Sequence, residues 1–568
     1  MANENIVVDD GRAKWSDLWL KEDYWAIWIG FFILIISGLI MMNGRADIEA
    51  QLSKYDAVIA AEKAKPIKTI ELIQAQAGKK AVAGNKLPAA KTIIGYLKTP
   101  AKWSGNPMDS FMTHADESAK PAADAAAKAA ADALAAAKIA QDAASAASYQ
   151  NADLNKAAET AIADWQKADS AAAKAKAKIG SDTNLIPGLI ILGISLGVIT
   201  AIGMGVMGFN MVQYFIGFLG VYVLCLFANF LGGYKPTATY GLNAEIWSII
   251  VGMVVANTIG TPKWMKPAVQ VEYFIKAGLV LLGAEVLFNK ILAIGIPGIF
   301  VAWVVTPIVL ISTYIFGQTV LKMPSRTLNI TISADMSVCG TSAAIAVAAA
   351  CRAKKEELTL SVGLSMVFTA IMMIAMPAFI KAVGMPEVLG GAWIGGTIDA
   401  TGSVAAAGAF IGPKALQVAA TIKMIQNVLI GVSAFCVAIY FATRVEAHEE
   451  GMKVGPMEIW NRFPKFVIGF LTASIVLSTI AGNLGADLGN ALISNGTNKI
   501  TVPLRGWFFA LAFISIGLAT NFKELAGYFK GGKPIILYVC GQSFNLALTL
   551  FMAWIMFYKV FPEITASI

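Results

Sequence analysis

Stretches of about 20 consecutive apolar residues recur along this chain, and they constrain its fold more than any other feature, because that length crosses the hydrocarbon of a bilayer as a helix. Only 14% of the residues are charged and 57% are hydrophobic, whereas a soluble domain has about 25% charged residues. The apolar runs are too long and too rich in glycine for the strands of a membrane barrel. The sequence therefore predicts an all-α polytopic membrane protein.

Three regions follow one another along the chain: a cytoplasmic N-terminus with a first membrane anchor (1–42), a polar region (43–184) and a transmembrane transporter core (185–568). Within the polar region, residues 116–178 are dominated by alanine, the best helix former. The break SYQNAD at 148–153 predicts two helices folded back as a hairpin. Two interpretations stay open for this hairpin: a helical spacer without chemistry, or a coiled coil that docks a partner or oligomerises.

The loops predict a topology of eleven spans and two special segments, 329–352 and 387–412. We expect the two segments to be broken or re-entrant and to enter from opposite faces, as in an inverted-repeat secondary transporter. With a cytoplasmic N-terminus, the basic clusters then fall inside, among them Lys263, Lys266, Lys322, Arg326, Arg352 and Lys354. Residues 43–184 become extracytoplasmic, and the chain is predicted to be a multi-pass protein of the bacterial inner membrane.

Both special segments combine one aspartate with hydroxyls and glycine. The first carries Asp335, Ser337, Cys339, Gly340, Thr341 and Ser342, and the second carries Thr397, Asp399, Thr401, Gly402 and Ser403. Lipid offers no hydrogen bonds, so polar groups at membrane depth persist only inside protein or around a wet cavity. We therefore predict that the two segments meet and form a transport site.

The predicted roles follow from charge and helix ends. If the helix breaks at Gly340, the N–H groups at 340–342 begin a half-helix, which is an anion site; the alternative is close helix packing by small residues. Asp335 and Asp399 are the candidates for coupling to an ion or a proton. Lys423, on the following span, is predicted to place positive charge near Asp399 and to bind the anion; the alternative is a purely structural pair.

Other charges and polar groups in apolar segments receive structural interpretations. Glu272 and Lys276 are four residues apart and can form an ion pair along a helix. Gln542 and Asn545 are expected to form interhelical hydrogen bonds. Cys339 has no nearby base, so we expect it to line the site as a small residue rather than act as a nucleophile.

Several function classes are excluded by motif and composition. The two histidines lie far apart, and the chain has no CxxC, Walker loop, GxSxG or HExxH motif. Its five cysteines imply no disulfide framework. No arginine-rich stripe indicates nucleic acid. We expect no enzymatic activity, no catalytic residue, no cofactor and no metal site.

Three short motifs carry a resemblance to a known family: CGTSA at 339–343, GAWIG at 391–395 and VAAAG at 404–408. In these motifs the chain resembles the YeiH family, whose members are described as sulfate exporters, and the likeness covers most of 185–568. It implies inverted repeats and helices broken at mid-membrane. Two departures stand out: many relatives carry His-Glu where this chain has Asp399 and Ala400, and compact members lack the 43–184 insertion.

Together these observations predict a secondary active transporter of a small inorganic or organic anion (sulfate, sulfite or sulfonate-like), coupled to H⁺ or Na⁺. Its other partners would be the lipid bilayer and further copies of the chain in a homo-oligomer. One alternative is a cation/proton antiporter with Asp335 and Asp399 as cation ligands. A second is a membrane receptor or scaffold that acts through the alanine-rich helices. The predicted substrate-binding residues are Ser337, Cys339, Gly340, Thr341, Ser342, Thr397, Thr401, Gly402, Ser403 and Lys423.

Overall fold

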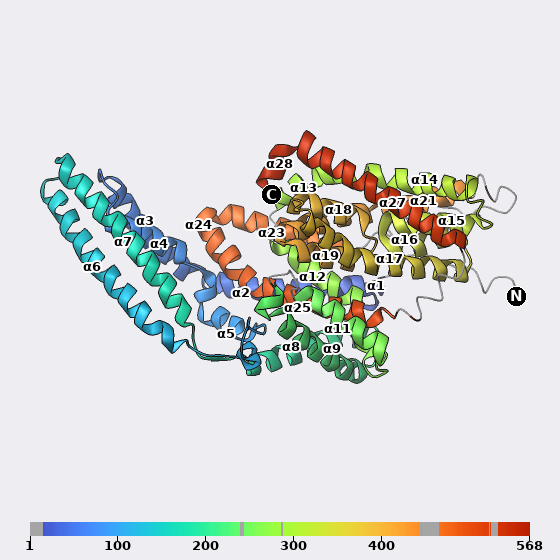
Figure 1. The fold of residues 1–568 in the computed structure, drawn as a ribbon, viewed down its shortest axis with the longest axis horizontal. Helices are drawn as coiled ribbons and strands as arrows, with labels where there is room; N and C mark the ends of the chain where they lie inside the picture. Colours follow the sequence, from blue (N-terminus) through green and yellow to red (C-terminus); the bar gives the residue numbers. More distant parts are fainter. Residues whose placement is uncertain are drawn as a thin grey trace. The chain divides into compact units, whose positions relative to one another are not determined.

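The chain is an all-α polytopic membrane protein, as predicted. The computed structural model describes residues 15–238, 244–285, 288–441, 445, 465–521, 523 and 532–568 (Figure 1). Within them, the strands are limited to β1 (Met112–Thr113) and β2 (Thr183–Asn184), which pair antiparallel with Met112 opposite Asn184. Everything else of regular structure is helical.

The chain divides into two compact units. The core unit comprises Met1–Ile33, Gly193–Ser478 and Leu504–Ile568, and the alanine-rich unit comprises Leu34–Leu192 and Thr479–Pro503. The alanine-rich unit thus holds the whole of the polar region predicted at 43–184 together with a later, partly helical segment. Four helices contribute residues to both units: α2 (Glu22–Asn43), α8 (Ile186–Val206), α23 (Phe466–Leu484) and α25 (Asn498–Ala519).

The remaining elements of the alanine-rich unit are mostly short. They are α3 (Arg45–Lys63), α4 (Ile70–Ala81), η1 (Gly84–Lys86), α5 (Pro88–Tyr96), η2 (Pro107–Ser110), η3 (Glu117–Ala119), α6 (Lys120–Ala146), α7 (Ala152–Ile179), α24 (Ala486–Gly489) and η8 (Asn490–Thr497). Lys79 at the end of α4 forms ion pairs with Asp487 at 2.6 Å and Asp56 at 2.5 Å. Its hydrogen bonds to these two carboxylates raise the pKa of Lys79, with Asp487 contributing most.

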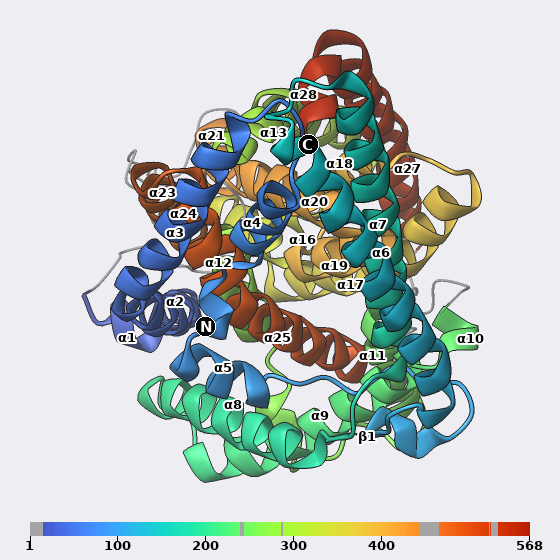
Figure 2. The same cartoon turned by 90° about the vertical axis from the view of Figure 1, so that its left-hand side faces the viewer.

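The predicted alanine-rich hairpin is confirmed. Helices α6 and α7 lie side by side in both views (Figures 1 and 2), and Ser148 and Tyr149 turn the chain between them with positive φ angles. The Asn151 side chain caps α7 by accepting from the backbone of Asp153 and Leu154. Buried alanines recur every seven residues along α6, at Ala123, Ala130, Ala137 and Ala144. Their small side chains let the two helices approach closely.

One large residue anchors this hairpin. Trp165 of α7 is 6% exposed and packs with Ile70, Ala137 and Ile162. Replacing a buried tryptophan by alanine leaves a cavity and costs about 3 to 5 kcal/mol. We expect Trp165→Ala to make α6 and α7 cleavable by protease in the folded, full-length protein at a concentration that spares the parent. The control is Lys167→Ala on the same helix, because the Lys167 side chain is 80% exposed; equal resistance of both variants would contradict the prediction.

The core unit holds most of the residues of the candidate membrane spans. Its further elements are α1 (Asp17–Leu20), α9 (Met211–Gly232), α10 (Lys235–Ala238), α11 (Ala244–Thr258), η4 (Lys266–Ala268), α12 (Val271–Glu285), α13 (Phe288–Ile299), η5 (Phe300–Val304), α14 (Val305–Thr319), α15 (Arg326–Ala334), η6 (Asp335–Cys339), α16 (Gly340–Ala350), α17 (Lys355–Ala382), α18 (Glu387–Thr397), α19 (Thr401–Ile411), α20 (Pro413–Asn427), α21 (Leu429–Tyr440), α27 (Gly532–Trp554), η10 (Ile555–Val560) and α28 (Pro562–Ser567).

Eleven helices of the described residues are long and apolar enough to cross a membrane, though they are not the eleven spans predicted. The set includes Arg326–Ala350, which the sequence analysis treats as a special segment. It omits Ile246–Thr258, which is apolar but shorter than a full span. By length and apolarity, Arg326–Ala350 qualifies as a membrane-crossing helix. The contacts between its two ends, described below, show that the segment folds back on itself instead.

Candidate functional site

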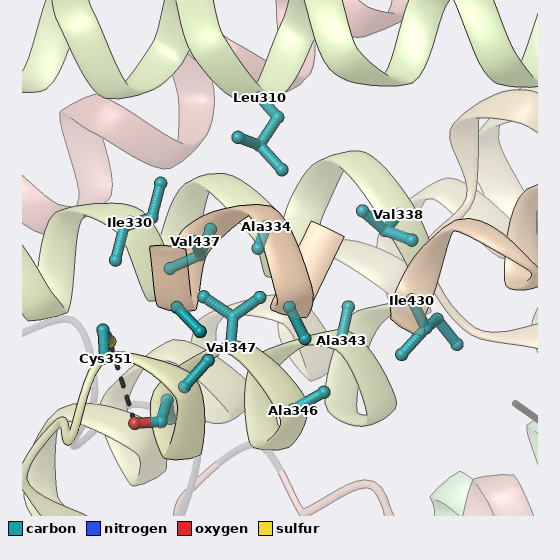
Figure 3. Packing of buried hydrophobic residues seen from close by; sticks show 14 of the residues in the cluster. Leu310, Ile330, Ala334, Val338, Ala343, Ala346, Val347, Cys351, Ile430 and Val437 are labelled. Atoms are coloured by element: carbon teal, nitrogen blue, oxygen red, sulfur yellow. Dashed lines mark hydrogen bonds between the residues drawn. The ribbon is translucent and has the colours of Figure 1, made fainter. Parts of the chain in front are cut away.

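The first special segment is a helical hairpin. It consists of α15, the π-helical segment η6, and α16, with the break at Gly340 where φ is +50°. The chain then returns along itself, because the Thr331 hydroxyl lies 4.0 Å from the Cys351 sulfur. Ile330 and Ala334 of the first arm pack in one apolar cluster with Val347 of the second (Figure 3). The predicted break at Gly340 is confirmed.

The second special segment has the same architecture. Helix α18 ends at Thr397, and α19 begins at Thr401 after a non-helical linker. A Cβ atom at Gly412 would lie 2.6 Å from the Glu387 carboxylate, and one at Gly390 would lie 3.4 Å from Ile411. The beginning of α18 therefore lies beside the end of α19, and this segment is a hairpin as well. We call the two the first hairpin (α15–η6–α16) and the second hairpin (α18–α19).

Helix α17 connects the two hairpins and shows that they enter from opposite ends. At its beginning, Glu357 accepts a hydrogen bond of 2.8 Å from Thr327, at the base of the first hairpin. Near its other end, Ile380 contacts Gly390, at the base of the second hairpin. At 1.5 Å per residue, positions 357 and 380 are about 35 Å apart, comparable to the hydrocarbon thickness of a bilayer.

The tips of the hairpins meet beside the middle of α17. A Cβ atom at Gly340 would lie 3.3 Å from the Asp399 Cβ and 3.3 Å from the Ser365 hydroxyl. The Cys339 sulfur lies 3.8 Å from the Thr401 hydroxyl. The structure thus brings the two predicted segments together at their breaks, with one aspartate from each hairpin buried at the junction.

Hydroxyl groups from neighbouring helices hold the two aspartates. The Ser361 hydroxyl donates to Asp335 Oδ2 at 2.6 Å. Asp399 Oδ2 accepts from the Ser365 hydroxyl at 3.2 Å and from the Tyr538 hydroxyl of α27. The Tyr538 ring is fixed by stacking on Phe368, with ring centroids 4.6 Å apart. Each carboxylate therefore has one oxygen that is held by protein hydroxyls.

Lys423 lies near enough to Asp399 for their charges to interact, but its ammonium forms no direct salt bridge with that carboxylate. Its ammonium donates instead to the Val338 carbonyl oxygen at 2.8 Å and to Gln426 Oε1 at 2.8 Å. The physical reason is the broken helix: the carbonyls at its end have no partner within the helix and carry partial negative charge. That end attracts the ammonium as a carboxylate would.

Three amide side chains complete the capping of the hairpin tips. Gln426 donates to the Ser337 carbonyl at 3.0 Å, and Gln542 donates to the Thr397 carbonyl at 3.1 Å. Asn545 donates to the Met336 carbonyl at 3.3 Å. The interhelical hydrogen bonds predicted for Gln542 and Asn545 are confirmed and hold the tips against α27, while Gln426 holds the first tip against α20.

The predicted small and hydroxyl residues separate into two groups. Ser337, Cys339, Gly340, Thr397, Thr401, Gly402 and Ser403 are buried at or beside the junction. Among them, the Ser337 hydroxyl bonds to the Ser333 carbonyl of its own helix, and Thr401 accepts from Asn427 at 3.2 Å. Thr341 and Ser342, in the first turn of α16, are exposed.

Sequence reasoning missed the hydroxyls of α17 and, on α27, Tyr538. Ser361, Ser365 and Thr369 are spaced by four residues and so share one face of α17. That stripe of hydroxyls in an apolar helix is a visible signal, although serine and threonine in membrane helices commonly bond to their own helix and attract no notice. No pattern in the sequence marks Tyr538, because only the tertiary fold brings its hydroxyl to Asp399.

The other charges within the apolar segments lie outside the junction. The predicted pair of Glu272 and Lys276 is confirmed at 3.6 Å, and Lys276 is also bound by Glu22 at 2.5 Å and Asp23 at 2.7 Å. Glu285 pairs with Arg505 at 2.7 Å. Within the part of the chain that the structure describes, no three His, Cys, Asp or Glu side chains gather in a way that could hold a metal ion.

Comparison with known proteins places the chain in a family. The model of the family described as Conserved hypothetical protein 698 matches residues 216–538, which contain both hairpins, α17 and Lys423. A UPF0324 membrane protein of Nitratidesulfovibrio vulgaris is 59% identical over 99% of both chains. The chain belongs to the UPF0324 membrane protein family. This confirms the resemblance to the YeiH family, which corresponds to the same family model.

Other UPF0324 proteins match a part of the chain. The protein RB9488 of Rhodopirellula baltica is 57% identical over 61% of this chain and 63% of its own length. The protein TauZ of Paracoccus denitrificans is 26% identical over 54% of this chain and 87% of its own length. No solved structure matches the chain.

Proposed function

We propose that this UPF0324 protein is a secondary active transporter of a small sulfur-containing anion, namely sulfate, sulfite or a sulfonate, coupled to H⁺ or Na⁺. It would work in the bacterial inner membrane, with its N-terminus in the cytoplasm and residues 43–184 outside. The observation that supports the proposal most is the meeting of two helical hairpins, entering from opposite ends of α17, at a polar junction half-way along that helix.

Such an arrangement suits alternating access. Helices interrupted at membrane depth bring free backbone groups to a buried site, and inverted arrangements let each side open in turn. The first turn of α16 offers N–H groups together with the exposed Thr341 and Ser342 hydroxyls, which is the chemistry that binds an anion. Lys423 adds the positive charge at the same junction.

Two arguments support a sulfur-containing anion as the substrate: the donor groups at the junction and the name of one relative. Oxyanions and sulfonates present several acceptor oxygens and a delocalised charge, which match hydroxyl and backbone N–H donors. The Paracoccus denitrificans relative carries the taurine-related name TauZ, and taurine is a sulfonate. Taurine, sulfate and sulfite are therefore the substrates to test first.

Transport is tested with purified full-length protein in liposomes. We expect radiolabelled taurine or sulfate to enter by counterflow when the same unlabelled anion is loaded inside, and not in protein-free liposomes. The rival function, a cation/proton antiporter that uses the Asp335 and Asp399 carboxylates, predicts a Na⁺-driven change of internal pH without anion flux. That outcome would contradict the anion proposal. A scaffold that acts through α6 and α7 would show neither flux.

A further inference from the structure

Neither of the two buried aspartates forms a direct ion pair, although the Lys423 ammonium lies near enough to Asp399 for their charges to interact. Asp335 is 0% exposed and Asp399 is 1% exposed, and among the described residues their bonds are to the Ser361, Ser365 and Tyr538 hydroxyls. The two carboxylates interact with each other, and Ser365 is close to both. Two like charges in a buried site repel each other strongly unless a proton or a bound cation neutralises one of them.

Three buried oxygens at this junction form no hydrogen bond of normal length and angle with a described protein group. They are Asp335 Oδ1, Asp399 Oδ1 and Thr369 Oγ1. Thr369 is 6% exposed, lies one turn after Ser365 on α17 and is adjacent to the Asp399 carboxylate. A proton can join only two oxygens, whereas an alkali cation needs a set of hard oxygen ligands, of which carboxylate and hydroxyl oxygens are typical.

Charge counting gives the valence of the missing partner. The junction holds two carboxylates and one ammonium, that of Lys423. Their formal sum when all three are ionised is one negative charge, which a single monovalent cation neutralises. A divalent cation would leave the buried junction positive.

We propose that Asp335, Asp399 and Thr369 form a binding site for one Na⁺ ion between the tips of the two hairpins. The site rests on the proposed function, since its role would be to couple Na⁺ to anion transport. One carboxylate comes from each hairpin, so Na⁺ bound here holds the two tips together. Thr369 supplies a neutral ligand from α17, the helix that both hairpins share.

The first test is binding of Na⁺ alone to the purified full-length protein, with no anion substrate added. Thermal unfolding is measured as K⁺ is replaced by Na⁺ at constant ionic strength and pH. A ligand that binds only the folded state raises the unfolding temperature with its concentration, so we expect a saturable increase with Na⁺ and none with K⁺. Asp399→Asn should abolish the increase.

Thr369→Val provides a second variant that keeps both charges. It removes the hydroxyl oxygen at nearly constant shape, and we expect the apparent Kd for Na⁺ to rise about tenfold, the size of one lost charge-assisted contact. The matched control is Thr421→Val on α20. Thr421 is also buried, at 2% exposed, but its hydroxyl is already bound to the Gln417 carbonyl of its own helix. The control should bind Na⁺ as the parent does.

The outcomes separate this proposal from the transport function. Anion uptake driven by a pH gradient, with no effect of Na⁺ on either unfolding or uptake, would overturn the Na⁺ site and leave the transporter standing. Na⁺-specific stabilisation without any anion uptake would support the site and overturn the proposed function. Equal Na⁺ affinity in Thr369→Val and Thr421→Val would overturn the assignment of Thr369 as a ligand.

Discussion

Replacing Lys423 by methionine is expected to reduce anion uptake at least about 100-fold, because a buried charge that holds a network together is worth several kcal/mol. Lys423 is 1% exposed, and its ammonium donates to the Val338 carbonyl and to Gln426. Methionine fills similar space without a charge or a donor. The variant therefore leaves the end of η6 without its cap and the two aspartates without the nearby positive charge.

The same substitution is expected to lower the free energy of unfolding by about 2 kcal/mol, since buried acceptors would lose their donor. Initial rates of taurine or sulfate uptake into liposomes measure the first effect, and thermal unfolding measures the second. Lys414→Met is the control, because Lys414 is on the same helix but exposed. Uptake by Lys423→Met above half that of the control would remove Lys423 from the site.

The second large effect is expected from Gly340→Ala. Gly340 has φ +50° and ψ −131°, a conformation that residues with a Cβ avoid at a cost of about 1 to 3 kcal/mol. The added methyl group would also lie 3.3 Å from the Asp399 Cβ and from the Ser365 hydroxyl. The tip of the first hairpin must shift to relieve both, so we expect uptake to fall at least about tenfold by the loss of near-ideal geometry.

Gly295→Ala controls for the change of glycine to alanine itself. Gly295 lies within α13, and a Cβ there would meet no atom within 4 Å. Alanine is the better helix former by about 1 kcal/mol, so this variant should be as stable as the parent or more so. A Gly340→Ala protein with full uptake and an unchanged unfolding temperature would show that the tip tolerates a side chain, contrary to the geometry.

Much of the fold was predictable because it depends on local chemistry. Apolar length predicted the membrane class, and alanine content with a polar break predicted the α6–α7 hairpin. Gly340 predicted where the first hairpin turns, since only glycine fits such a turn easily. Equivalent composition in the two special segments, each with one aspartate, predicted that they would meet.

The partners within the site were not predictable in the same way. The sequence shows Lys423 and Asp399 as opposite charges in apolar surroundings, and pairing them was the simplest inference. It could not show that a helix end would present the Val338 carbonyl to Lys423. Nor could it show that Asp399 would be held by Ser365 and Tyr538. Every residue has a backbone carbonyl, so the sequence does not show which of them will accept a hydrogen bond from a buried side chain. Only the tertiary fold decides that.

Helix α17 supplies hydroxyl groups to the aspartates of both hairpins, and this limits which insertions and deletions the helix can tolerate. Ser361, Ser365 and Thr369 share one face of α17 only because they are spaced by four residues. One residue inserted before Ser361 would turn that face by about 100° and advance it by about 1.5 Å. The alanine-rich hairpin is under no such restriction, because adding seven residues to each of its helices restores the same contacts one repeat further on. Insertions and deletions should therefore accumulate in α6 and α7 and be absent from α17.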